Sequence, residues 1–170
     1  MDTIVDVCRQ QRLDPKRTYF WICFLCVDQH AVVQERKQGR SVPTQQFLES
    51  FERRVSGIGR LVCMMAPWEE PIYLTRCWCI FEVATGFKTQ GCDVIVAMPP
   101  QQKKQIQELL TGGDEINEGM NALYDALAST KVQDGKASVE ADRRHILDLV
   151  KRQEGGYFAT NVLVNTRLRA

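Results

Sequence analysis

Three short, largely apolar runs constrain the fold of this chain more than any other feature of its sequence. They lie at residues 19–27, 59–67 and 92–100 and lack the regular polar alternation of a half-exposed strand. Runs of this kind are typical of strands that are buried on both faces of a parallel sheet. Pro67 ends the second run and Pro99-Pro100 ends the third, because proline cannot continue the hydrogen-bond ladder of a sheet.

The segments around these runs have the apolar periodicity of amphipathic helices. The pattern predicts helices at residues 2–12, 44–55, 75–91, 101–110, 117–128, 139–153 and 156–170. The stretch 129–135 is compatible with a short edge strand. Alternating strands and helices with short connections predict one α/β domain with a parallel sheet over residues 1–170.

Composition excludes several function classes. The 22 basic and 21 acidic side chains leave a net charge of +1, which gives no electrostatic footprint for nucleic acid or an anionic membrane. The run at 19–27 is too short to span a bilayer, and the first residues lack the basic and apolar regions of a signal peptide. Most of the seven cysteines lie in apolar runs, as buried reduced thiols do. We therefore expect an intracellular, reducing compartment.

Cysteine and histidine spacings do not favour a metal site or a thiol nucleophile. Cys23 and Cys26 are three apart on an expected strand and would point to opposite faces. Cys77 and Cys79, on an expected helix, diverge by about 200°. His30 follows the first run and could approach that helix as a base, but a role in capping a loop is favoured.

The segment "LTRCWCIFEV", residues 74–83, contains the best candidate for chemistry, which is Glu82. Trp78 and Cys79 are its neighbours one helical turn earlier, so its surroundings are partly apolar. Such a setting raises the pKa of a glutamate and prepares it for proton transfer or for stabilising a cation. Pairing with Arg76 or Lys88, or exposure to solvent, is an equally good interpretation of the residues alone.

Other polar groups are expected near the same edge of the sheet, because ligands collect at the carboxyl ends of parallel strands. Asp28 and His30 follow the first run, and Trp68 follows the second. Arg76 lies in the first turn of the next helix, where a cation opposes the helix dipole. It could bind an anion, or it could pair with an acidic residue at 69–70.

The segment "PIYLTRCWCIFEVATG" (71–86) resembles the Ser-x-Trp-Cys-Leu-x-Glu-Leu element of TIR (Toll/interleukin-1 receptor-like) domains. The resemblance is to the divergent TIR-like domains of large multidomain eukaryotic proteins. "FWICFLCVDQH" (20–30) is similar to the second strand of that family. The segments at 141–150 and 155–169 are similar to its closing helices, so the resemblance covers nearly the whole chain.

The resemblance implies a flavodoxin-like fold, with a five-stranded parallel sheet flanked by helices. Members act as self-associating adaptors or as enzymes that cleave the nicotinamide–ribose bond of NAD. In the enzymes the glutamate of the shared element is catalytic, and it corresponds to Glu82. Its expected work is to hold the ribose hydroxyls while an oxocarbenium-like centre develops. NAD would then be a substrate rather than a cofactor, with substrate-binding residues Trp68, Arg76, Trp78, Asp28 and His30.

Two departures from the family pattern decide which of these functions we expect. The family begins with a strand that is central in the sheet order 2-1-3-4-5, whereas this chain begins inside the helix that follows it. The flanking strands would carry unpaired backbone groups, which are costly when buried. Another chain could donate a strand, residues 19–27 and 60–66 could pair directly, or the natural chain could extend upstream. In addition, position 23 is cysteine, where the family commonly has aspartate.

We therefore expect a flavodoxin-like parallel sheet that lacks its first, central strand. The expected function is that of a non-catalytic protein–protein interaction or assembly subunit, without a cofactor. Its partners would be other protein chains that complete the sheet at residues 19–27 and 60–66. The alternative is an NAD glycohydrolase or cyclase with Glu82 as the catalytic carboxylate.

Overall fold

The computed structural model describes residues 2–22, 34, 38, 44–111, 121, 124–125 and 127–169. Its sheet consists of the parallel strands β1 (Arg60–Met64) and β2 (Asp93–Ala97), paired from Arg60 with Asp93 to Met64 with Ala97. Both strands fall within apolar runs of the sequence, which confirms the second and third predicted strands. The described residues therefore have an α/β architecture with a parallel sheet, as the alternating pattern predicts.

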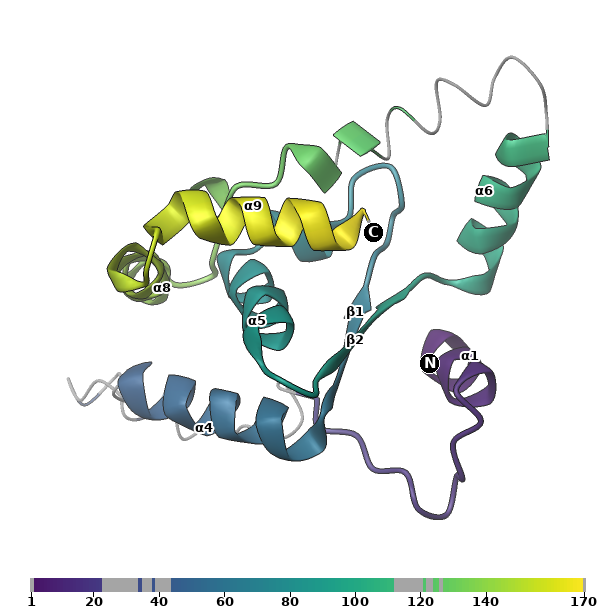
Figure 1. Ribbon diagram of the computed structural model, residues 1–170, viewed down its shortest axis with the longest axis horizontal. Coiled ribbons are helices and arrows are strands. Elements are labelled where there is room, and N and C mark those ends of the chain that lie inside the picture. Colours follow the sequence, from purple (N-terminus) through teal and green to yellow (C-terminus); the bar gives the residue numbers. More distant parts are fainter. Residues whose placement is uncertain are drawn as a thin grey trace.

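The helices surround this sheet on two sides (Figure 1). They are α1 (Asp2–Gln10), α4 (Thr44–Ile58), α5 (Cys77–Lys88), α6 (Pro100–Thr111), α8 (Glu140–Arg152) and α9 (Gly156–Leu168). Each of them lies at a predicted helix, with ends that differ from the prediction by a few residues. The predicted helix at 117–128 lies mostly outside the described residues. In the described part of the chain, no helix is both long and apolar enough to cross a membrane.

Helix α5 lies at the centre of the core. It connects β1 to β2, as a crossover between parallel strands requires, and contacts the sheet, α8 and α9. Because these elements cover it on several sides, it is apolar around most of its circumference rather than along one stripe. Gly86 lets it approach the sheet closely: a Cβ atom there would lie 2.8 Å from Leu61 Cδ2 and 3.0 Å from Val94 Cγ2.

The prediction of a short edge strand at 129–135 is wrong. Val132–Asp134 form a 3-10 helix, and the only bridge of the sheet type near it joins Lys136 to Arg76 within the described residues. Side chains, rather than a neighbouring strand, form hydrogen bonds with the backbone groups of this segment. The Val132 N–H donates to Asn161 Oδ1 at 2.9 Å, and Arg143 donates to the carbonyls of Gln133 and Gly135 at 2.6 and 2.9 Å.

The predicted first strand at 19–27 is not found where the structure describes it. Residues 19–22 have no regular secondary structure, and Tyr19 is 87% exposed; residues 23–27 lie outside the described residues. Trp21 instead packs against α4, with its ring centroid 6.1 Å from that of Phe51 and with the Arg54 guanidinium 4.9 Å above it. Trp21 therefore anchors this segment to a helix.

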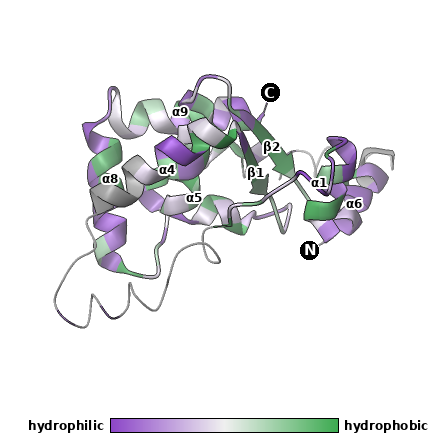
Figure 2. Ribbon diagram, turned by 90° about the horizontal axis from the view of Figure 1, so that it is seen from below, coloured by the Kyte–Doolittle hydropathy of each residue, from purple (hydrophilic) through white to green (hydrophobic). Residues whose placement is uncertain are grey.

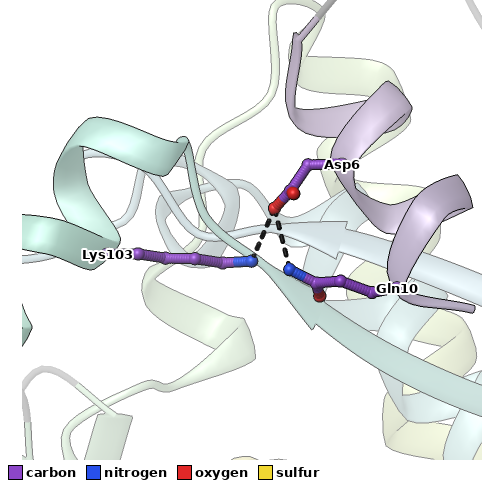
Figure 3. Close-up of polar contacts among 3 residues, drawn as sticks. All are labelled: Asp6, Gln10 and Lys103. Carbon is purple, nitrogen blue, oxygen red and sulfur yellow. Dashed lines mark hydrogen bonds and ion pairs between the residues drawn. The ribbon is translucent and has the colours of Figure 1, made fainter.

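Helices α1 and α6 lie side by side at one end of the molecule, away from α5, α8 and α9 (Figure 2). A polar clasp joins them: Lys103 Nζ lies 2.9 Å from Asp6 Oδ2, and Gln10 Nε2 donates to the same oxygen at 2.9 Å (Figure 3). The Lys103 and Asp6 side chains are each about one-third exposed. The clasp fixes α1 beside the sheet.

Candidate functional site

A cavity of about 820 Å3 runs along β1 on the side away from β2, since several β1 residues line it and none of β2 does. Its walls come from α1, from the segment 13–22, from α4 and from the strand itself. The lining residues are Ile4, Val7, Leu13, Arg17, Thr18, Tyr19, Phe20, Trp21, Ile22, Phe51, Arg54, Val55, Ile58, Gly59, Arg60, Leu61, Val62, Met64, Tyr73 and Glu82. Most of them are apolar.

The backbone of β1 presents hydrogen-bonding groups to this cavity. Asp93 N–H donates to the Gly59 carbonyl at 3.0 Å, and Met65 N–H donates to the Ala97 carbonyl at 2.8 Å. In a parallel ladder the residues of one strand alternate in the neighbour to which they bond, so the odd-numbered residues of β1 face β2. The N–H and C=O groups of Arg60, Val62 and Met64 therefore point to the opposite edge. Within the described residues, β1 pairs with β2 alone.

The charged residues among those that line the cavity are three arginines and one glutamate. Arg60 is the first residue of β1, and Arg54 lies about one helical turn before the end of α4. The Arg60 guanidinium is 3.6 Å from Asp93, and its buried Nε has no hydrogen-bond partner among the described residues. The cavity is thus basic near the start of β1.

Glu82, the predicted catalytic carboxylate, lines the cavity from α5 and is half-buried. Near it, the Cys63 thiol donates a hydrogen bond of 3.7 Å to the Tyr73 hydroxyl oxygen. Burial raises the pKa of Cys63 to about 12, against the opposing effect of Tyr73, and the Glu82 charge raises it further. Burial also raises the pKa of Tyr73 well above its ordinary value, and Cys63 and Glu82 add to that rise. At neutral pH both groups hold their protons, so Cys63 is not a thiolate nucleophile.

The other predicted site residues lie elsewhere or outside the described residues. Trp68 is buried, and its indole N–H has no hydrogen-bond partner among the described residues. Arg76 is exposed at the start of α5, and Trp78 packs, half-buried, against the core. None of these three lines the cavity. Asp28 and His30 lie outside the described residues.

Trp21 and Tyr73 are among the residues of this site that sequence reasoning missed. Trp21 stood within an expected strand, where its bulk indicated only burial. Tyr73 lies in the 3-10 helix Ile72–Thr75, and its separation of nine positions from Glu82 gave no sign that the two line one cavity. The tyrosine hydroxyl within an apolar stretch was the available signal, because a buried tyrosine hydroxyl usually finds a polar partner.

No disulfide bond joins the cysteines of the described residues, which are Cys8, Cys63, Cys77, Cys79 and Cys92. Cys63 and Cys77 are fully buried, as expected for cysteines that act as small apolar side chains. Across the described ranges, no three histidine, cysteine, aspartate or glutamate side chains are grouped so that they could hold a metal ion.

Comparison of the chain with models of protein families, with curated proteins and with solved structures finds no match.

Proposed function

We propose that this chain is a non-catalytic protein–protein interaction or assembly subunit, built on a TIR-like domain of flavodoxin-like architecture, that binds another protein chain at the edge of β1. The observation that carries the proposal is the edge of β1 that has no neighbouring strand among the described residues. Arg60, Val62 and Met64 direct backbone donors and acceptors toward an apolar cavity rather than toward a neighbouring strand of the described sheet. Addition of a strand to such an edge is a recurring mode of protein recognition.

The energetics favour occupation of this edge by protein. Three residues offer six backbone hydrogen-bonding groups, and each bond made to a partner contributes roughly 0.5–1.5 kcal/mol. The apolar lining adds roughly 25 cal/mol for each Å2 removed from water. Met64 is 40% exposed and Val62 is half-buried, so both remain accessible to a partner. An exposed strand edge without a partner is prone to unspecific association, which a specific partner prevents.

Site-directed photo-cross-linking tests the proposal. Benzoylphenylalanine in place of Met64 is expected to form an adduct with one recurring protein in cells that express the chain naturally. The same group in place of Arg144, an exposed residue of α8, serves as the control and is expected to form none. Mass spectrometry identifies the adduct, and the purified partner is then titrated against the chain. If position 64 yields no intermolecular adduct, the proposal is wrong.

The second candidate function is cleavage of the nicotinamide–ribose bond of NAD, with Glu82 as the catalytic carboxylate. The observation that favours it is that Glu82 lines a cavity whose volume falls in the usual range of small-molecule sites, about 300–1,000 Å3. Arg17, Arg54 and Arg60 in the same lining would suit the pyrophosphate of a dinucleotide.

Nicotinamide release separates the two functions. The purified chain is incubated with NAD, and release of nicotinamide is followed by chromatography, with the Glu82→Gln variant as the matched control. The interaction function predicts no release above background. Steady release that Glu82→Gln abolishes would establish the enzyme instead.

A further inference from the structure

We infer that the edge of β1 takes an extended, apolar segment of a partner protein, with an acidic residue placed beside Arg60 and Arg54. The inference rests on the proposed function and specifies the chemistry of the partner at the same site. It concerns the conformation, the side-chain pattern and the charge of the segment that binds.

The length of the edge sets the length of the segment. β1 has five residues, and a strand rises by about 3.3 Å per residue, so the paired part of the partner is about five residues long. Its backbone must be extended in order to bond with Arg60, Val62 and Met64 in turn. A helix would satisfy its own backbone groups and leave those of β1 unpaired.

The walls on both faces of the strand determine the side chains of the segment. Leu61 faces α5, because its side chain contacts the position of Gly86, and α4 lies on this side of the sheet (Figure 1). On the opposite side lies α1, which contributes Ile4 and Val7 to the cavity lining. A strand added between these walls would be covered on both faces. Its residues would therefore form a continuous apolar run rather than an alternating pattern.

The charge of the cavity places the acidic residue. Arg60 begins β1, and Arg54 lies before it in the last part of α4. The charge of Glu82, in contrast, raises the pKa of Tyr73 and of Cys63, which lies farther along β1. The cavity is thus basic at the start of β1 and acidic farther along it. A carboxylate near Arg60 would complement this end and would fix the direction in which the segment lies. It would also give the buried Arg60 Nε an acceptor, which it lacks among the described residues.

Selection of peptides against the full chain tests this inference. A displayed library of random peptides of about ten residues is selected for binding to the immobilised protein. We expect the enriched peptides to share about five consecutive residues rich in Val, Ile, Phe and Tyr, with Asp or Glu at one end of the run. Enrichment of a different pattern, or of no pattern, would overturn the inference.

The variant Val62→Pro tests whether binding uses the strand edge. Proline removes the Val62 N–H, which points away from β2, so the β1–β2 ladder is kept. We expect the enriched peptides to bind this variant roughly tenfold more weakly, because a backbone acceptor of the peptide loses its donor. Val62→Ile keeps the N–H and is expected to bind as the natural chain does. Unchanged unfolding transitions show that both variants fold, and equal peptide affinity for both would contradict strand addition.

Reversal of one charge tests the placement of the acidic residue. Arg60→Glu is expected to weaken peptides with an acidic end by roughly fivefold or more and to strengthen the same peptides with lysine at that end. Affinities that do not respond to the reversal would refute the predicted charge.

The inference and the proposed function fail in different ways. An adduct at position 64, together with peptides that are indifferent to Val62→Pro, would keep the interaction function and reject strand addition. Absence of both the adduct and the enriched peptides would reject the two together.

Discussion

The two sides of helix α5 are built differently. Toward α8 and α9 the core is closed: Ile80, Val83, Val150 and Val164 are fully buried. Toward β1 and α4 the same core opens into a cavity beside a strand edge that lacks a described neighbour. Stability is not uniform across a protein, and binding surfaces are drawn from its less stable parts. We therefore expect the first side to carry the stability of the chain and the second to carry its recognition.

Shortening one valine to alanine on each side of α5 tests this difference in packing. Val150→Ala in α8 deletes fully buried methyl groups and leaves a void, and is expected to lower the free energy of unfolding by about 2–3 kcal/mol. Val55→Ala in α4 borders open space, so the penalty for a new void is small and about 1 kcal/mol is expected. Urea denaturation measures both. Equal losses would show that the cavity side is packed as tightly as the other.

Alkaline pH should lower the free energy of unfolding, because the Cys63 thiol of β1 is buried in the core. Burial raises the pKa of Cys63 from 9.0 to about 12, so the folded chain keeps this proton after the unfolded chain has released it. The contribution of the protonated thiol to stability is therefore complete below about pH 9 and is lost as the pH rises toward 12. By about pH 11 the free energy of unfolding is expected to fall by roughly 2–3 kcal/mol.

Cys63→Ala provides the control for this loss, because alanine does not titrate. Urea denaturation of the variant between pH 8 and pH 11 is expected to show a shallower decline than that of the natural chain. Tyr73, whose pKa is raised in the same direction, contributes at the upper end of the range. Parallel declines in the two proteins would contradict the assignment to Cys63.

Two glycine substitutions compare a tight contact with an open one. Gly86→Ala places a methyl group 2.8 Å from Leu61 Cδ2, and the resulting overpacking is expected to cost about 1–2 kcal/mol. Gly57→Ala in α4 meets no atom within 4 Å and is expected to stabilise the chain by about 0.5–1 kcal/mol, because alanine favours the helix. Thermal denaturation of the two variants should therefore shift in opposite directions. A loss of stability at Gly57 would contradict the open surroundings of that position.

The closed side could be predicted from the sequence because its patterns are local. The apolar run at 92–100 and the periodicity of 139–153 each follow from neighbouring residues, and β2 and α8 lie within them. The edge strand at 129–135 could not be judged in this way. There the backbone bonds to the side chains of Asn161 and Arg143, which are distant in the sequence.

The open side was predicted less well, because its geometry depends on which elements meet. The aromatic residues at 19–22 indicated a buried strand, yet Trp21 packs on α4. Glu82 was identified from its helical neighbours and does line the cavity, whereas Trp68, Arg76 and Trp78 do not. These residues are close in the sequence, but in the structure their side chains point to different places: Trp68 is buried, Arg76 is exposed, and Trp78 packs against the core. The TIR-like architecture stays a prediction.

The smallest predicted effect concerns the clasp that holds α1 beside the cavity. Asp6→Asn weakens the ion pair with Lys103 and the hydrogen bond from Gln10, and is expected to cost about 0.5–1 kcal/mol because the pair is partly screened by solvent. The exposed pair Lys104–Glu108 is the control, and Glu108→Gln is expected to cost a few tenths of a kcal/mol at most. Added salt should reduce the loss of stability caused by Asp6→Asn only in part. Because α1 forms one wall of the cavity, Asp6→Asn should also weaken the enriched peptides more than Glu108→Gln does, and equal peptide affinities would show that α1 does not shape the site.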